Sequence, residues 1–333
     1  MPSFGVAFIY VIGFGPERTR TYFICFYLTA AGQSVILCIY DIHNIGGGSS
    51  MEQLISVQNI NKKYERFELK NISFTLEKGY IMGFIGRNGA GKTTTLKTML
   101  NLVRADSGAV SFLGKDFSTN EFACKQKIGF MLGGAFYYPK QRLKTITDVV
   151  RRFYDEWDDA EYARYLKRFN LDPDKKVDEL SAGMKVKYAL ALALSHHAQL
   201  LILDEPTSGL DPVSRDDMLE LFQEIIEDGE KSILFSTQIT SDLEKCADFI
   251  TYIKDGEVVA STEKDEFLNS FKVVKGTGVQ LTEGLRRRLI GLKKNSFGFS
   301  GLIRTRDLHQ DAGLEVSEAD IESVMIYFEK GCA

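Results

Sequence analysis

The feature that most constrains this chain is the glycine-rich segment at residues 86–93, whose sequence is GRNGAGKT. It follows a continuous apolar run at residues 80–85, which is typical of a buried central strand. Residues 94–102 come directly after it and favour a helix. The segment thus matches the G-x-x-x-x-G-K-T pattern in its strand–loop–helix setting, and a chance glycine-rich turn is the weaker interpretation.

This pattern predicts a phosphate cradle for physical reasons. Glycines let the backbone curve around an anion at dihedral angles that other residues avoid. The loop amides then point inward, and the N-terminus of the following helix adds a favourable dipole. Lys92 would reach the β- and γ-phosphates of a nucleotide, and Thr93 would offer its hydroxyl to Mg²⁺.

A second motif ends another apolar run, at residues 200–203. The run predicts a buried strand, and Asp204, Glu205 and Pro206 follow it. A carboxylate at the carboxyl end of a parallel strand lies at the ligand crevice of an open α/β sheet. Asp204 could hold Mg²⁺ directly or through water, and Glu205 could accept a proton from an attacking water. An ordinary surface acidic pair would be credible only without the phosphate motif.

The order of four further segments resembles the ATP-binding subunit of ABC transporters. Residues 180–184 read LSAGM, residues 185–197 favour a helix, residues 208–211 read SGLD, and residues 233–237 favour a strand. The resemblance covers about residues 52–272. Its closest likeness is to the YtrB-like, bacitracin- and acetoin-type branch of ABC-2 exporter ATPases, on residues 153–158, 180–184 and 320–331.

The resemblance implies a fold, a site and partners. The fold would be α/β, a P-loop NTPase domain of the ABC type, with a RecA-like core, an antiparallel β portion and a helical subdomain. ATP and Mg²⁺ would be the ligands. Thr93 and Asp204 would hold the metal, and Glu205, Lys92 and Gln238 would act in catalysis. Tyr64 would stack on adenine. The other nucleotide-binding residues would be Gly86, Asn88, Gly89, Ala90, Gly91, Lys92, Thr93, Thr94, Ser181, Gly183 and Asp211.

The resemblance also implies that two chains share each nucleotide. Ser181 can donate its hydroxyl, and the amides of Ala182 and Gly183 begin a helix, so this segment would form a second anion site. In the family that site faces the γ-phosphate held by the other subunit. The simpler alternative is an ordinary helix start with Ser181 as its N-cap.

Two departures from the family pattern affect the chemistry. Gln238 stands where the family usually has a histidine, and glutamine can donate a hydrogen bond but cannot carry a proton near pH 7. Residues 128–133 lack the glutamine that the family has there, and Gln141 is the nearest one downstream. These departures favour slower hydrolysis, or a heterodimer to which this chain contributes one degenerate site.

Residues 1–50 differ from the rest of the chain. Their charged residues are Glu17, Arg18, Arg20 and Asp41, and residues 21–40 are just long enough to span a bilayer as a helix. Polar residues interrupt that stretch. Three glycines end at residue 48, shortly before Met51. Because glycine codons begin with GG, a ribosome-binding site translated in frame would give such glycines just before a true start codon. We therefore hypothesise that the start is misassigned and that the working protein begins at Met51. A membrane anchor and a flexible linker are the alternatives.

The remaining chain predicts an ATPase domain at 51–272, with its helical subdomain at about 125–195, and a small accessory region at 273–333. His196 and His197 end an apolar helix, where the helix C-terminus explains them better than a metal does. Lys and Arg total 41 and Asp and Glu total 45, so the net charge of −4 argues against a nucleic-acid partner.

No series of long apolar spans follows residue 51, so transport would require a separate ABC-2 type permease. We therefore expect an ATP-hydrolysing subunit of an exporter, bound to the cytoplasmic face of the membrane. A second ATPase subunit, identical or different, would complete it. A soluble ABC-type ATPase of translation or repair is the alternative. A P-loop kinase or GTPase fits less well, because residues 180–184 (LSAGM) resemble the signature motif of ABC ATPases.

Overall fold

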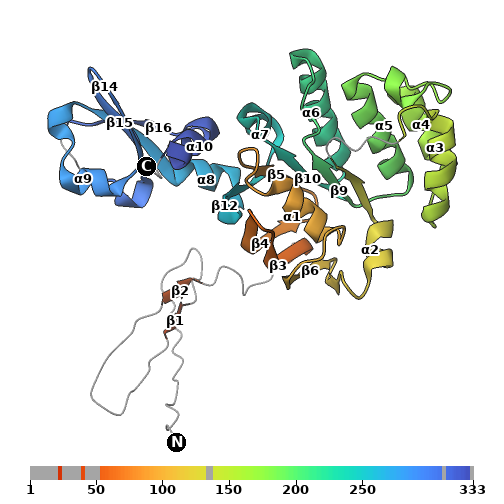
Figure 1. Ribbon diagram of the computed structural model, residues 1–333, viewed down its shortest axis with the longest axis horizontal. Coiled ribbons are helices and arrows are strands. Elements are labelled where there is room, and N and C mark those ends of the chain that lie inside the picture. The colour runs from red at the N-terminus through yellow and green to blue at the C-terminus, as the bar shows by residue number, and fades with distance from the viewer. Residues whose placement is uncertain (1–21, 25–38, 42–52, 133–137, 310–312, 331–333) are drawn as a thin grey trace, which may run out of the picture. The chain divides into compact units, whose positions relative to one another are not determined.

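The computed structural model describes residues 22–24, 39–41, 53–132, 138–309 and 313–330 (Figure 1). The chain divides into two units, residues 1–51 and 52–333. In the first unit, β1 (Tyr22–Ile24) pairs antiparallel with β2 (Ile39–Asp41). The hypotheses of a misassigned start and of a membrane anchor concern residues 1–50, of which the structure describes only these two strands, so both stay hypotheses. Within the described ranges, no helix combines the length and apolar character that a membrane crossing needs.

A six-stranded sheet forms the centre of the second unit, in the order β12-β11-β5-β10-β9-β8. All neighbouring pairs are parallel except β11 and β12. Three of the four inner strands, β5, β10 and β9, are buried along their whole length, as expected for strands of a parallel sheet covered on both faces. The strands are β5 (Ile81–Ile85), β8 (Ile128–Met131), β9 (Leu200–Asp204), β10 (Ser232–Thr237), β11 (Phe249–Lys254) and β12 (Glu257–Glu263).

A smaller antiparallel sheet, in the order β4-β3-β6-β7, packs beside the central one. Alternate residues of β4 are buried, and the Phe74 ring of this strand lies 5.6 Å from the Phe84 ring of β5. This sheet is the predicted antiparallel β portion. Its strands are β3 (Gln53–Lys63), β4 (Glu68–Glu77), β6 (Ser107–Phe112) and β7 (Lys115–Asp116).

Two helices connect these sheets, α1 (Lys92–Met99) and α2 (Glu121–Gln126). Helix α1, which follows the glycine-rich segment, ends at Met99, three residues before the end that the sequence predicted at residue 102. Its end is explained by Asn101, whose φ of 54° lies in the left-handed region that terminates helices.

Three helices pack together between β8 and β9: α3 (Leu143–Val150), α4 (Asp159–Arg168) and α5 (Ala182–Ser195). They lie within the predicted helical range of about residues 125–195, which also includes the end of α2 and β8 of the central sheet. Hydroxyl groups join all three helices, because Thr147 Oγ1 lies 2.7 Å from the Tyr162 hydroxyl and 2.9 Å from the Tyr188 hydroxyl. Two short 3₁₀ turns, η1 (Arg151–Phe153) and η2 (Val177–Glu179), link them.

Helix α6 (Pro212–Ile226) connects β9 to β10, and α7 (Thr240–Cys246) connects β10 to β11. Helix α8 (Lys264–Asn269) follows β12, the last strand of the central sheet. The last part of the chain, called here the C-terminal module (residues 271–330), is a four-stranded antiparallel sheet in the order β14-β15-β13-β16. Its elements are β13 (Phe271–Gly276), η3 (Gly278–Gln280), α9 (Glu283–Arg288), β14 (Leu289–Asn295), β15 (Gly298–Arg304), η4 (Thr305–Asp307), β16 (Glu315–Glu318) and α10 (Ile321–Lys330).

The C-terminal module shares a hydrophobic core with the rest of the unit. Val324 of α10 and Leu243 of α7 are both fully buried in one apolar cluster. Figure 1 shows α10 between the sheet of the module and α7 and α8. The module is therefore packed on the rest of the unit, through α10 against α7 and through Phe271 of β13 against Phe267 of α8.

His196 follows α5 and is held by packing. Its ring stacks on Tyr154 with 3.7 Å between ring centroids, and its Nδ1 lies 3.1 Å from the carbonyl oxygen of Gln126. Burial lowers the pKa of His196 to about 4. The ring is therefore neutral at pH 7, so burial and stacking explain its position better than the charge–dipole interaction expected at a helix end.

This buried imidazole predicts a pH dependence of stability. Between the unfolded pKa near 6.5 and the folded pKa, only the unfolded chain binds the proton, so stability is complete at neutral pH and falls with acidification. We expect His196 to contribute a loss of about 2 kcal/mol between about pH 7 and pH 5. Denaturant unfolding should show a flatter profile for His196→Asn, while the exposed control His197→Asn keeps the wild-type slope. Equal slopes in all three proteins would contradict the assignment.

Candidate functional site

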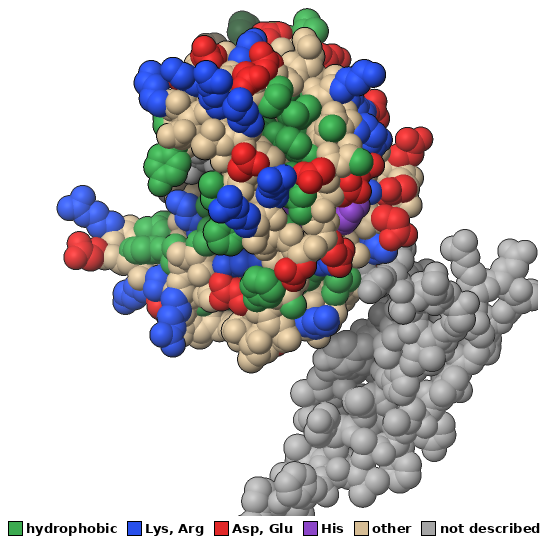
Figure 2. Space-filling model, turned by 90° about the vertical axis from the view of Figure 1, so that its right-hand side faces the viewer, with side chains coloured by type: hydrophobic (Ala, Val, Ile, Leu, Met, Phe, Trp, Pro, Cys, Tyr) green, Lys and Arg blue, Asp and Glu red, His purple; other side chains and the backbone are tan. Residues whose placement is uncertain are grey.

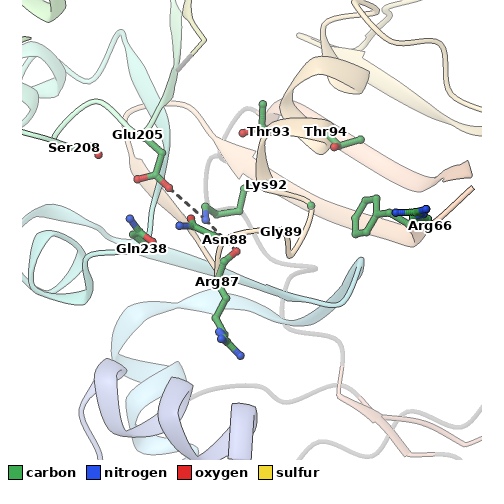
Figure 3. A pocket seen from close by; sticks show the side chains of 12 residues that line it. Arg66, Arg87, Asn88, Gly89, Lys92, Thr93, Thr94, Glu205, Ser208 and Gln238 are labelled. Carbon is green, nitrogen blue, oxygen red and sulfur yellow. Dashed lines mark hydrogen bonds and ion pairs between the residues drawn. The ribbon is translucent and has the colours of Figure 1, made fainter. Parts of the chain in front are cut away.

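The phosphate loop (residues 86–93) opens onto a cavity of about 650 Å³ (Figure 3). The loop joins β5 to α1, and the carboxyl ends of β9 and β10 approach it from the side, as expected for ligand crevices of parallel sheets. The lining residues are Arg66, Phe67, Arg87, Asn88, Gly89, Gly91, Lys92, Thr93, Thr94, Glu205, Ser208 and Gln238.

Two glycines of the loop stand where no side chain fits. Gly91 is the N-cap of α1 and has a φ of 113°, and a Cβ there would lie 2.8 Å from the Phe67 ring. A Cβ at Gly86 would lie 2.4 Å from the carbonyl oxygen of Ile253 on β11. The loop can therefore take this curvature, pressed between neighbouring strands, only with glycine at these positions.

Lys92 lies at the base of the cavity and is only 5% exposed. Its Nζ donates to the carbonyl oxygens of Gly86 at 2.7 Å and Arg87 at 3.3 Å. The same Nζ lies 3.3 Å from the Glu205 carboxylate. These contacts compensate the buried charge, and they place the amine where a phosphate held by the loop amides would meet it.

Asp204 is buried beside the first turn of α1. It accepts hydrogen bonds from the Thr93 hydroxyl at 2.8 Å and from the Ser236 hydroxyl at 2.5 Å. A hydroxyl and a carboxylate so close together are oxygen donors of the kind that Mg²⁺ prefers. The two residues predicted to hold the metal therefore fit it chemically.

Glu205 has an unusual backbone and an unusual side-chain environment. Its φ of 52° lies in the left-handed region, and its N–H donates to Ser236. Among the described residues its Oε2 finds no hydrogen-bond partner although it is buried. Burial raises the pKa of Glu205, and the positive charge of Lys92 opposes that shift. The Glu205 carboxylate lines the cavity, and its unpartnered oxygen keeps an unused acceptor position of the kind that a general base needs.

The structure brings most of the predicted site residues into this one place. Asn88, Gly89, Gly91, Lys92, Thr93, Thr94, Glu205 and Gln238 line the cavity, while Gly86 and Asp204 hold their neighbours in position from behind it. Ala90 is buried, and its N–H closes the loop by donating to the Arg87 carbonyl at 3.1 Å.

Other predicted residues lie elsewhere on the chain. Ser181 caps α5, accepting from the Met184 N–H at 3.2 Å, and Gly183 follows it on that helix. Asp211 caps α6. Tyr64 is outside the lining, 44% exposed, with the Lys62 amine 5.7 Å from its ring centroid. Of the segment lacking the expected glutamine, residues 128–132 are described, and residue 133 lies outside the described residues.

Sequence reasoning missed four residues of the lining: Arg66, Phe67, Arg87 and Ser208. Phe67 contacts Gly91 through the end of its ring, close enough that a Cβ there would be 2.8 Å away. The only available signals were the proximity of Arg66 and Phe67 to Tyr64 and the position of Arg87 and Ser208 inside recognised motifs. None of these signals says which side chain faces the cavity.

Comparison with known proteins finds relatives whose descriptions agree with one another. Residues 69–208 match the family model described as ABC transporter. The chain is 32% identical to the ABC transporter ATP-binding protein YtrB of Bacillus subtilis, over 66% of this chain and 75% of that protein. It is 33% identical to the Nod factor export ATP-binding protein I of Burkholderia lata, over 62% of this chain and 69% of that protein.

A solved structure described as the ATP binding subunit of an ABC transporter has the same fold. It superimposes with a TM-score of 0.58 at 27% identity, covering 64% of this chain and 91% of that chain. The similarity confirms the predicted α/β fold class, that of a P-loop ATPase with an antiparallel β portion and a helical region.

The geometry of the phosphate loop makes a direct binding prediction. Replacing Lys92 by alanine removes the buried amine that lies against Glu205, so the affinity for ATP should fall at least about tenfold, the cost of losing a charge-assisted contact. Filter retention of labelled ATP measures this. Lys97→Ala, on the last turn of the same helix and outside the lining, is the control. Equal retention by all three proteins would remove the cavity from consideration.

Proposed function

The chain belongs to the ABC transporter family as an ATP-binding subunit, and on this premise we propose that it hydrolyses ATP in the described cavity and drives export through a separate membrane permease. The observation that carries the proposal is the Glu205 carboxylate, held 3.3 Å from Lys92 with its second oxygen unpartnered among the described residues. One carboxylate oxygen is thus fixed beside the phosphate site while the other can accept a proton.

In the proposed reaction, Glu205 accepts the proton of a water that attacks the γ-phosphate. The Lys92 amine and the loop amides offset the charge that develops on the phosphate oxygens. Thr93 and Asp204 would hold Mg²⁺, which when bound supplies further positive charge to the phosphates. Gln238 lines the same cavity and can donate a hydrogen bond to a phosphate oxygen.

We also infer that two chains are needed to enclose the nucleotide. Ser181 is exposed at the N-terminus of α5, where its hydroxyl and the following amides offer an anion site outside the cavity of its own chain. A second ATPase subunit carrying the same segment would seal the open side of the cavity. The nucleotide would then hold the two subunits together.

A degenerate site within a heterodimer is a second candidate, favoured by Gln238. This side chain lies in the cavity where the family usually has histidine, and it cannot relay a proton near pH 7. In this version the chain binds ATP firmly and hydrolyses it slowly, while a different ATPase subunit supplies the faster site.

Exposed aromatic side chains support docking to a permease. Phe122 of α2 is 67% exposed and Phe153 of η1 is 68% exposed. Gln126 joins these elements, because its Nε2 donates to the Phe153 carbonyl at 2.7 Å. Figure 2 shows the face that carries α3 and α4, where hydrophobic side chains emerge among charged side chains of both signs. Exposed apolar groups with a charged rim suit a protein partner, which would place the chain on the cytoplasmic face of a membrane.

Hydrolysis is tested by two substitutions in one assay. Glu205→Gln should keep ATP binding and lower the single-turnover rate by about 10²–10⁴. Because only the ionised carboxylate accepts a proton, wild-type activity should be lost as the pH falls through the raised pKa of Glu205.

Gln238→His should increase the rate of ATP hydrolysis by the lone chain. A brisk wild-type rate that Gln238→His leaves unchanged would remove the argument for a degenerate site.

Docking is tested by affinity capture from native membranes. The tagged wild-type chain should retain a protein with several membrane spans, and Phe153→Ser should retain much less because it removes an exposed apolar contact. Phe297→Ser, at a 92% exposed position of the C-terminal module, is the matched control and should behave as wild type. Capture of no such protein by the wild-type chain would favour the soluble ATPase of translation or repair type.

A further inference from the structure

The phosphate loop is joined to the last helix of the chain. Arg87, the second residue of the loop, directs its guanidinium away from Lys92 and toward α10, as Figure 3 shows. Its Nη1 lies 3.2 Å from Oε2 of Glu329 on α10. Although 242 positions separate these residues in the sequence, the fold makes them an ion pair at the edge of the cavity.

Glu329 is held in place independently of Arg87. Its side chain is 17% exposed, and its Oε1 accepts a hydrogen bond from the Tyr252 hydroxyl at 3.3 Å. Tyr252 lies on β11 and is fully buried. Burial, and then the nearby Glu329 charge, raise the pKa of Tyr252, so its hydroxyl keeps the proton that it donates. The Glu329 carboxylate is therefore a fixed acceptor for Arg87.

The end of α10 is fastened to the same strand by two further contacts. Lys254 Nζ donates to the Phe328 carbonyl at 2.8 Å. The Tyr252 and Phe328 rings pack edge to face with 5.7 Å between centroids. Residues 328 and 329 thus sit on β11 through polar and apolar groups together.

Strand β11 and its hairpin also support the phosphate loop. The Ile253 carbonyl leaves no space for a Cβ at Gly86, and the Gly256 N–H donates to the Ala90 carbonyl at 3.0 Å. The Arg87 carbonyl belongs to the loop itself, because it accepts from Ala90 N–H and from Lys92 Nζ. A movement of the Arg87 side chain would therefore act on the backbone that forms the phosphate cradle.

The other face of α10 contacts the sheet of the C-terminal module. The Tyr327 hydroxyl donates to Ser300 Oγ at 2.9 Å, and the Lys293 amine lies 4.8 Å from the centre of the Tyr327 ring. Gly291 approaches the Tyr327 carbonyl so closely that a Cβ there would be 2.2 Å from it. Helix α10 therefore contacts both the sheet of the module and, through Glu329, the phosphate loop.

We propose that Glu329 is a positioning residue, which holds Arg87 and through it the phosphate loop, so that docking of α10 and binding of ATP favour each other. The proposal rests on the proposed function, since it requires nucleotide in the cavity. Arg87 is 68% exposed, and a pair of this exposure couples weakly, so the effect on ATP affinity should be about two- to fivefold. By reciprocity, ATP strengthens the docking of α10 by the same factor.

The first test separates positioning from general damage by kinetics on the full chain. Glu329→Ala should raise the KM for ATP about two- to fivefold and leave kcat unchanged, because Glu329 touches neither the phosphates nor Glu205. Glu329→Gln, which keeps an acceptor for the Tyr252 hydroxyl, should show the same rise without loss of thermal stability. Glu322→Ala, an exposed residue of the same helix, is the matched control and should change nothing.

A double-mutant cycle asks whether Glu329 acts through Arg87. The variant Arg87→Ala with Glu329→Ala should have the KM of Arg87→Ala alone, since the pair is already broken. Full additivity of the two effects would overturn the proposal, and so would tighter ATP binding by Glu329→Ala, which would mean that Glu329 withholds Arg87 from the nucleotide.

Hydrogen exchange gives a readout that needs no hydrolysis. A non-hydrolysable ATP analogue with Mg²⁺ should slow exchange at residues 86–93 and at residues 321–330 of the wild-type chain. In Arg87→Ala the protection of 321–330 should disappear while that of 86–93 persists. Protection of 86–93 without any effect on 321–330 in the wild type would overturn only the coupling. No protection at 86–93 would overturn the proposed function on which the coupling rests.

Discussion

The buried amine of Lys92 is the interaction on which the rest of the site depends. A lysine this inaccessible must be compensated, and here the compensation comes from two loop carbonyls and from the Glu205 carboxylate. Because the loop follows β5 and Glu205 follows β9, one charge joins the ends of two strands that have β10 between them. The same contacts that stabilise the charge therefore assemble a phosphate-binding group and a proton acceptor at one edge of the sheet.

The cavity is open on one side, and the exposed Ser181 segment lies outside it. This arrangement separates two tasks. Residues of the phosphate loop and of β9 are arranged within one chain, whereas the helix N-terminus at Ser181 is available to another. In the proposed dimer, a site shared in this way would depend on nucleotide to join two surfaces.

The C-terminal module also supports the phosphate loop. Its helix α10 packs on β11, the strand that also leaves no room for a side chain at Gly86. Support for the phosphate loop thus comes from an element that no nucleotide-binding motif includes. The weak, exposed character of the Arg87–Glu329 pair suits an adjustable contact better than a structural one, because an exposed ion pair contributes little to stability.

Local chemistry was sufficient for much of this protein. The buried strands at residues 81–85 and 200–204 and the glycine-rich turn at Gly91 follow from apolar runs and from a motif with known spacing. The contacts of Phe67, Arg87 and Glu329, and the unpartnered oxygen of Glu205, did not follow. They depend on which strands become neighbours and which way a side chain turns. Only tertiary packing decides that, because residues far apart in the sequence meet through the order of strands in the sheet.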